Sequence, residues 1–127
     1  MDRSKDWLRQ AERDLEQARW SFKGEFHELA CFLSQQAAEK AVKAVCQARK
    51  REAWGHAISR LLPIMAGDAN VPPGIARAAR QLDRHYVPAR YPNGFDTGVP
   101  ADYYGAEDAE EAIGYAEQLI AFCKQHL

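Results

Sequence analysis

The basic residues of the middle of this sequence form a cluster with aromatic residues. Four arginines stand there against one acidic residue, Asp83, and two tyrosines lie among them. Guanidinium groups bind phosphate through paired hydrogen bonds, and aromatic rings stack on bases. The segment therefore predicts contact with a nucleotide or single-stranded RNA. The arginines are Arg77, Arg80, Arg84 and Arg90, the tyrosines are Tyr86 and Tyr91, and we assign the binding role to Arg84, Tyr86, Arg90 and Tyr91.

Two structural explanations compete with this binding role. Residues 93–127 carry seven acidic residues and one Lys, although the net charge of the whole chain is only −1. The arginines could therefore form ion pairs with an acidic C-terminal helix. The stretch 90–94 could also be a structural turn, because Pro92 and Asn93-Gly94 are typical turn residues and Tyr91 could anchor the following loop.

The histidines and cysteines do not have the spacing of a metal site. The four histidines are scattered, and there is no CxxC or HExxH motif. We expect no metal and no cofactor. The three cysteines have no close pair and are predicted to be small buried apolar residues: Cys31, Cys46 and Cys123.

Two histidines lie next to predicted helix ends and have structural explanations. His85 is interpretable as a half-buried residue at a helix C-terminus, held as a cation by the helix dipole. His56 is interpretable as a helix-start residue packed under Trp54.

The composition sets the fold class in which these side chains must be placed. The chain has 127 residues, enough for one domain over residues 1–127. It contains 22 Ala but only 11 Val, Ile and Thr together, which favours helices and leaves little material for a sheet. We therefore predict an all-α fold.

Apolar periodicity places the first two helices. Residues 4–23 have the spacing of a helix that packs along a neighbour, and Gly24 is predicted to end it in the left-handed conformation. Residues 26–50 have a wide apolar arc, which predicts a central helix touched on two sides. Its solvent side is predicted to hold Glu39, Lys40, Lys43 and Gln47.

Three apolar residues fall on predicted polar faces of these helices. They are the candidates for a subunit interface, although a loop of the same chain could cover them instead. The three are Trp20, Leu29 and Phe32.

The rest of the chain is predicted to contain three more helices and a loop. A short helix covers residues 57–62, and Pro63 ends or kinks it. A helix that starts near residue 75 ends by Val87, because Pro88 disfavours the helical conformation in the preceding residue. Residues 88–105 are predicted as loop, and the last helix has an acidic first turn that opposes its dipole.

No stretch approaches 18 apolar residues, and the first residues carry no apolar run. We therefore expect a cytoplasmic protein with no membrane contact.

Two stretches together resemble the HEPN family, small all-α domains named for higher eukaryotes and prokaryotes nucleotide-binding. They are residues 31–44, CFLSQQAAEKAVKA, and residues 82–93, LDRHYVPARYPN. The start of the chain, with Trp7 and Asp14, and Gly55-His56 also look like that family. The resemblance implies an up-and-down four-helix bundle with an additional short helix, usually a homodimer or higher oligomer.

The resemblance implies three kinds of function. Many members bind a minimal nucleotidyltransferase, as a toxin-antitoxin pair or as an accessory subunit, and others are thought to bind nucleotides. A third group are metal-independent RNases whose site forms across a dimer and whose signature is Arg, four to six residues, then His. Here that signature fits Arg80 with His85 and, as a weaker candidate, Arg51 with His56. The toxin subclass has one residue between His and a following Tyr, whereas Tyr86 follows His85 directly.

We therefore predict a HEPN-type binding module that contacts a nucleotide or RNA and pairs with a nucleotidyltransferase. One alternative is a metal-independent RNase in which His85 acts as general acid or base and Arg80 stabilises the phosphorane charge. Whether the chain is an enzyme stays open at this point. The other alternative is an oligomeric structural protein without a ligand.

Overall fold

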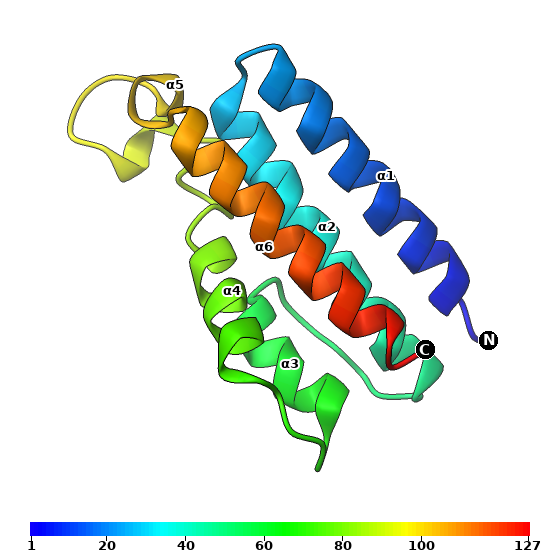
Figure 1. Ribbon diagram of the computed structural model, residues 1–127. Helices are drawn as coiled ribbons and strands as arrows, with labels where there is room; N and C mark the ends of the chain where they lie inside the picture. Colours follow the sequence, from blue (N-terminus) through cyan, green and yellow to red (C-terminus); the bar gives the residue numbers. More distant parts are fainter.

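Three long helices lie side by side along the length of the molecule (Figure 1). A computed structural model describes all residues, 1–127. The long helices are α1 (Ser4–Lys23), α2 (His27–Ala48) and α6 (Ala106–Lys124). The shorter α3 (Ile58–Ala66) and α4 (Pro73–Asp83) pair beside them. A loop with the one-turn α5 (Pro100–Tyr103) projects from the end of the molecule opposite to α3. The prediction of an all-α fold is confirmed.

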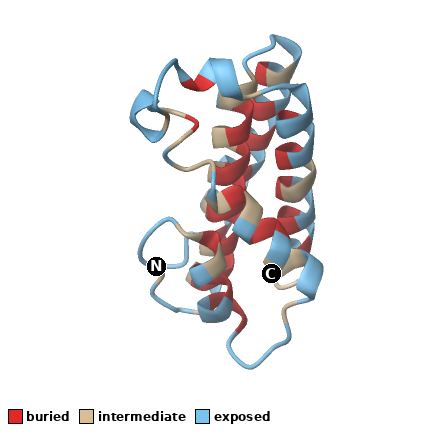
Figure 2. Cartoon of the chain, turned by 90° about the vertical axis from the view of Figure 1, so that its left-hand side faces the viewer, coloured by how far each residue is buried: buried red, intermediate tan, exposed pale blue.

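Helix α2 is the centre of the packing, because it contacts all five other α-helices. Its buried side is rich in Ala, which lets the neighbouring backbones approach closely. The core is one cluster of 26 buried residues drawn from five of the helices. Figure 2 shows that these buried residues lie along the helices, whereas the connecting loops are largely exposed.

The first helix has the predicted bounds, but its end is made differently. Gly24 has a φ of −81°, and the left-handed residue is Glu25, with a φ of 66°. The amide of Phe26 then donates to the carbonyl oxygen of Ser21, which closes the last turn. The prediction of a left-handed Gly24 is therefore wrong by one residue.

Two of the shorter predicted elements also differ in length. Helix α3 continues through Pro63 to Ala66, because burial of Met65 and Ala66 outweighs the one hydrogen bond that a proline removes. Helix α4 ends at Asp83, before the predicted Val87. From His85 the amides donate to carbonyl oxygens three residues back, as in a tight turn, and Pro88 follows.

The segment 88–105 is not entirely loop as predicted. It holds the one-turn 3₁₀-helix η1 (Pro92–Gly94) and α5, so the structure has six α-helices instead of five. Within this segment the rings of Phe95 and Tyr103 stack at 4.1 Å, and the Tyr103 hydroxyl donates to the carbonyl oxygen of Thr97. The segment thus packs on itself. None of the helices has both the length and the apolar character that crossing a membrane needs.

Candidate functional site

A buried carboxylate on the central helix holds a histidine from the loop before α3. Glu39 is only 4% exposed, and its oxygens accept from Gln35 Nε2 at 3.1 Å, Lys43 Nζ at 3.1 Å and His56 Nδ1 at 3.0 Å. A carboxylate can only accept, so Nδ1 of His56 carries the hydrogen. His56 Nε2 makes no hydrogen bond within the chain, and the side chain is 50% exposed. The ring is therefore fixed at one nitrogen and open to solvent at the other.

The backbone before His56 is shaped to reach Glu39. Gly55 has a φ of +90°, a left-handed conformation that favours glycine. Gln35 Nε2 also donates to the carbonyl oxygen of His56 at 3.0 Å, so one amide group holds both the histidine backbone and its carboxylate partner. Glu39 was predicted on the solvent side of its helix, and this prediction is wrong, because the loop carrying His56 covers it.

Asp83 joins the end of α4 to the start of α3. Its carboxylate accepts from the amide of Ile58 at 2.7 Å and from the amide of Ser59 at 3.2 Å. These are amides of the first turn of α3, which have no partner inside the helix, and a negative charge is favourable there. The bond brings the residues after α4 next to those before α3, and Tyr86 stacks on His56 with ring centroids 4.5 Å apart.

Arg90 lies among three aromatic rings. Its guanidinium carbon is 4.4 Å from the ring centroid of Phe32, 4.6 Å from that of Tyr86 and 5.1 Å from that of Tyr91. Nε donates to the carbonyl oxygen of Tyr86 at 2.7 Å, whereas the two terminal nitrogens have no partner in the chain. The guanidinium is thus held in place while its fork of donors remains free, which is the geometry that binds phosphate. Tyr91 beside it is 49% exposed.

Within one chain, Arg80 and His85 are not in contact, and a site that combines them across two subunits stays a prediction. His85 Nδ1 lies 3.3 Å from the Tyr104 hydroxyl, and its ring meets the edge of the Tyr104 ring, whereas Arg80 is exposed on α4. Burial lowers the pKa of His85 below its usual value, despite the nearby carboxylates of Asp108 and Glu111. His85 is half-buried directly after the end of α4, as the sequence indicates, but the lowered pKa disfavours the cation that was expected there.

The residues of the weaker pair, Arg51 and His56, line one cavity but make separate hydrogen bonds within the chain. Arg51 Nη1 donates to the carbonyl oxygens of Ile64 at 3.1 Å and Met65 at 2.8 Å, near the C-terminus of α3. Arg51 thus satisfies carbonyl groups that have no partner within the helix. His56 bonds to Glu39 instead, and Trp54, which was predicted to cover it, is largely exposed.

The four arginines of the basic segment form no ion pair with α6. The ion pairs of α6 are made with α1 instead: Arg19 with Glu117 at 2.8 Å and Lys124 with Glu12 at 3.2 Å. The alternative in which the basic segment is neutralised by the acidic helix is therefore wrong. Arg84 is exposed directly after α4, close in sequence to Tyr86 and Arg90.

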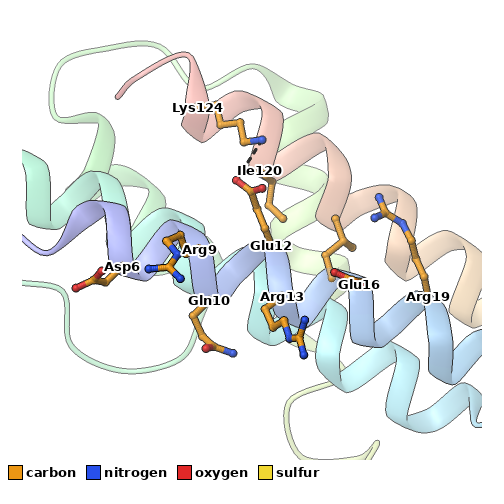
Figure 3. Close-up of a pocket in the computed structure, with 10 residues that line it drawn as sticks. Asp6, Arg9, Gln10, Glu12, Arg13, Glu16, Arg19, Ile120 and Lys124 are labelled. Carbon is orange, nitrogen blue, oxygen red and sulfur yellow. Dashed lines mark ion pairs between the residues drawn. The ribbon is translucent and has the colours of Figure 1, made fainter.

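The exposed face of α1 carries a separate charged pocket. Acidic and basic side chains alternate along it, and the Glu12–Lys124 ion pair closes one side (Figure 3). Arg9 and Arg13 line this pocket and are not part of the cluster around Arg90. They are matched controls for experiments on Arg84 and Arg90.

The three residues predicted for a subunit interface have different surroundings. Phe32 lies under Arg90 and near Tyr86 of the same chain. Trp20 is 62% exposed, with Lys23 Nζ 5.0 Å from its ring, and Leu29 is exposed on the first turn of α2. An intermolecular contact for these residues stays a prediction.

Sequence reasoning missed Glu39, Lys43 and Gln35 as site residues. Their common signal is a spacing of four residues, which puts three polar side chains on one face of a helix that is otherwise mostly apolar. No three His, Cys, Asp or Glu side chains come together in an arrangement that could hold a metal ion.

The chain is similar to known proteins over almost its whole length. A family model of the HEPN domain matches residues 4–126. A protein of Methanocaldococcus jannaschii whose name describes it as a candidate toxin is 28% identical, over 98% of this chain and 88% of its own.

Three solved structures are also similar to this chain over almost their whole length. A crystal structure of a protein from Thermus thermophilus has 41% identity, full coverage of both chains and a TM-score of 0.96. An archaeal HEPN homologue has 46% identity, 98% coverage of each chain and a TM-score of 0.84. A HEPN domain protein from Thermotoga maritima has 34% identity, 94% coverage of this chain, 95% of its own and a TM-score of 0.76.

Proposed function

This chain belongs to the HEPN domain family, and we propose that it is a binding module that contacts the phosphate of a nucleotide or of single-stranded RNA. One observation carries the proposal. Arg90 is held by Phe32, Tyr86 and Tyr91, yet its two terminal nitrogens have no partner in the chain. A phosphate group takes both donors, and the exposed ring of Tyr91 offers a face for a base. Arg84 adds a second positive charge on the same segment.

The experiment compares ligand binding by paired variants. Fluorescence anisotropy with a labelled single-stranded RNA is measured for the wild type, for Arg84→Ala with Arg90→Ala, and for Arg9→Ala with Arg13→Ala. Each double variant removes two positive charges, but only Arg84→Ala with Arg90→Ala removes the guanidinium group beside Tyr91. We expect about a tenfold or greater loss of affinity in the first variant and little change in the second. Equal affinities of all three proteins for the RNA would contradict the proposal.

A third variant separates charge from geometry. Arg90→Lys keeps the charge but has a single ammonium group in place of the planar fork. We expect it to bind more weakly than the wild type, and thermal unfolding of each variant checks that the segment around Tyr86 remains folded.

The partner that we propose is a minimal nucleotidyltransferase. The support is membership of the HEPN family and the similarity to a relative whose name describes a candidate toxin. A nucleotidyltransferase reading frame beside the gene and co-purification of the two untagged proteins would support the pair. Separate elution of the two co-expressed proteins would contradict it.

RNA cleavage is a second candidate function, and the Glu39–His56 pair favours it. A histidine held at Nδ1 by a carboxylate has Nε2 available as a general base. In such a reaction Nε2 takes the proton of a 2′-hydroxyl, and the 2′-oxygen forms a bond to phosphorus. The 5′-oxygen leaves and takes a proton from water, giving a 2′,3′-cyclic phosphate and a 5′-hydroxyl.

This candidate is tested by cleavage of a mixed RNA pool in EDTA. We compare the wild type with His56→Ala and His85→Ala. Loss of cleavage in His56→Ala alone supports the Glu39–His56 pair, and loss in His85→Ala alone supports the site predicted from Arg80 and His85. Absence of cleavage by the wild type leaves the binding module as the function.

A further inference from the structure

His56 also lines a cavity that does not include Tyr86 or Arg90. The cavity has a volume of about 710 Å³ and lies between the start of α1, the end of α2 and the segment that leads to His56. This volume is within the range of small-molecule sites, about 300–1,000 Å³. His56 is therefore the residue at which the cavity meets the surface around Arg90.

The cavity exists because the chain reverses at the end of α2. Lys50 has a left-handed φ of 56°, and the amide of Arg51 donates to the carbonyl oxygen of Cys46 at 2.9 Å. This hydrogen bond is typical of a helix C-terminus that is followed by a change of direction. The next residues return along α2, and Gly55 and His56 then close one side of the cavity.

Two tryptophans give the cavity aromatic surfaces. Trp7 comes from α1, and Trp54, from the returning segment, is 82% exposed. The indole nitrogen of Trp54 lies 3.3 Å from Glu52 Oε2, so its ring is tied at one end to its own loop. An exposed aromatic face of this kind is suited to stacking on a base.

The charged residues of the cavity include two exposed basic residues and connect the cavity to the Glu39–His56 pair. Lys50 and Arg51, which form no ion pair in the chain, line it together with Asp2 and Glu52, whereas the charge of Lys43 is neutralised by Glu39. Lys43 belongs to both places, because its Nζ lies 3.1 Å from Glu39 Oε2 and 6.0 Å from the Trp7 ring centroid.

We infer that this cavity binds a second nucleotide of the same RNA strand whose phosphate Arg90 contacts. The ligand is then an oligonucleotide rather than a free mononucleotide, and its backbone passes His56. The inference rests on the proposed function, since it extends that site to a strand. Three features support it: the shared residue His56, the two exposed basic residues Lys50 and Arg51, and an aromatic face on each side of His56, Tyr91 and Trp54.

The test uses two probes and changes either the cavity or the surroundings of Arg90, one at a time. Affinities for a short single-stranded oligoadenylate and for adenosine monophosphate are measured with the wild type, Trp54→Ala, Trp54→Phe and Arg90→Ala. Trp20→Ala is the matched control, because it removes an exposed tryptophan from a helix face outside the cavity. We expect Trp54→Ala to lower the affinity for the oligonucleotide about tenfold and to leave that for the mononucleotide unchanged. Trp54→Phe retains most of the affinity, because it keeps an aromatic face.

A fluorescence measurement reports contact directly. We expect the oligonucleotide to quench tryptophan emission in the wild type, and the quenching to fall in Trp54→Phe but not in Trp20→Ala. If Trp54→Ala and Trp20→Ala bind the oligonucleotide as tightly as the wild type while Arg90→Ala binds it weakly, the cavity is not a subsite and the proposed function stands. An equal loss for both probes in Trp54→Ala also overturns the inference. Unchanged binding in Arg90→Ala contradicts the proposed function itself.

Discussion

The ring of His56 stacks on the ring of Tyr86, with centroids 4.5 Å apart and planes inclined by 17°. One residue precedes α3 and the other follows α4, so the whole helical pair separates them in sequence. Asp83 makes this contact possible, because it binds the first turn of α3 from the end of α4. Tyr86 in turn contacts the guanidinium of Arg90. His56, Tyr86 and Arg90 of the candidate site are thus held together by one helix cap.

We predict that Asp83→Ala lowers the free energy of unfolding by about 1–2 kcal/mol. The substitution leaves the amides of Ile58 and Ser59 without their acceptor. Urea unfolding followed by circular dichroism measures the change, with Asp68→Ala as the control, because Asp68 is exposed after α3 and has no such bond. Equal stability of the two variants would show that the cap does not hold α3.

We predict a pH dependence of stability from His85. Burial lowers its pKa in the folded state, whereas in the unfolded chain it takes up a proton near its ordinary pKa of 6.5. Its contribution is therefore fully present above pH 6.5 and is lost as the pH falls below that value toward the lower folded pKa. Urea unfolding at several pH values should show a smaller loss of stability on acidification in His85→Gln than in the wild type. Parallel pH profiles for the two proteins would contradict this assignment.

We predict that the three cysteines react slowly in the folded protein. All are buried, and burial raises the pKa of Cys31 and of Cys123 from 9.0 to about 12, and that of Cys46 in the same direction. The reactive thiolate of the first two is then about a thousandfold rarer than in an exposed cysteine. A chromogenic disulfide reagent should label three thiols rapidly only in guanidinium chloride. Rapid labelling of the native protein would contradict this expectation.

We predict that Trp20 and Leu29 contribute to an interface between copies of the chain. Both are large, apolar and exposed near the turn between α1 and α2, and burying them in a contact is favourable. Sedimentation velocity should give an oligomer for the wild type and a smaller species for Trp20→Ala with Leu29→Ser. A monomeric wild type would contradict the prediction of an oligomer, and an unchanged species in the variant would move the interface elsewhere.

The helices could be predicted because each satisfies its hydrogen bonds locally and shows its buried face in the spacing of apolar residues. The range of α1 follows directly from that spacing, and the acidic first turn of α6 follows from its dipole. The end of α4 could not be predicted, because the side chain of Asp83 binds another helix far along the chain.

The candidate site was less predictable for the same reason. Arg90 and Tyr91 belong to the cluster of basic and aromatic residues that the sequence shows directly. The burial of Glu39 depends on where the loop carrying His56 crosses α2, and helical periodicity alone places such a polar residue in solvent. The hydrogen bonds of Arg51 could not be predicted, because its acceptors are backbone carbonyls, which no sequence motif marks.

The central position of α2 has a consequence for hydrogen exchange. Since α2 contacts all the other α-helices, its amides should exchange with solvent only when the whole fold opens. Glu39 is on α2, whereas Arg90 is on a segment outside the long helices, whose amides should exchange through local opening. We therefore expect the carboxylate that holds His56 to lie in the part of the molecule with the slowest hydrogen exchange, and the backbone around Arg90 to exchange sooner, without unfolding of the long helices.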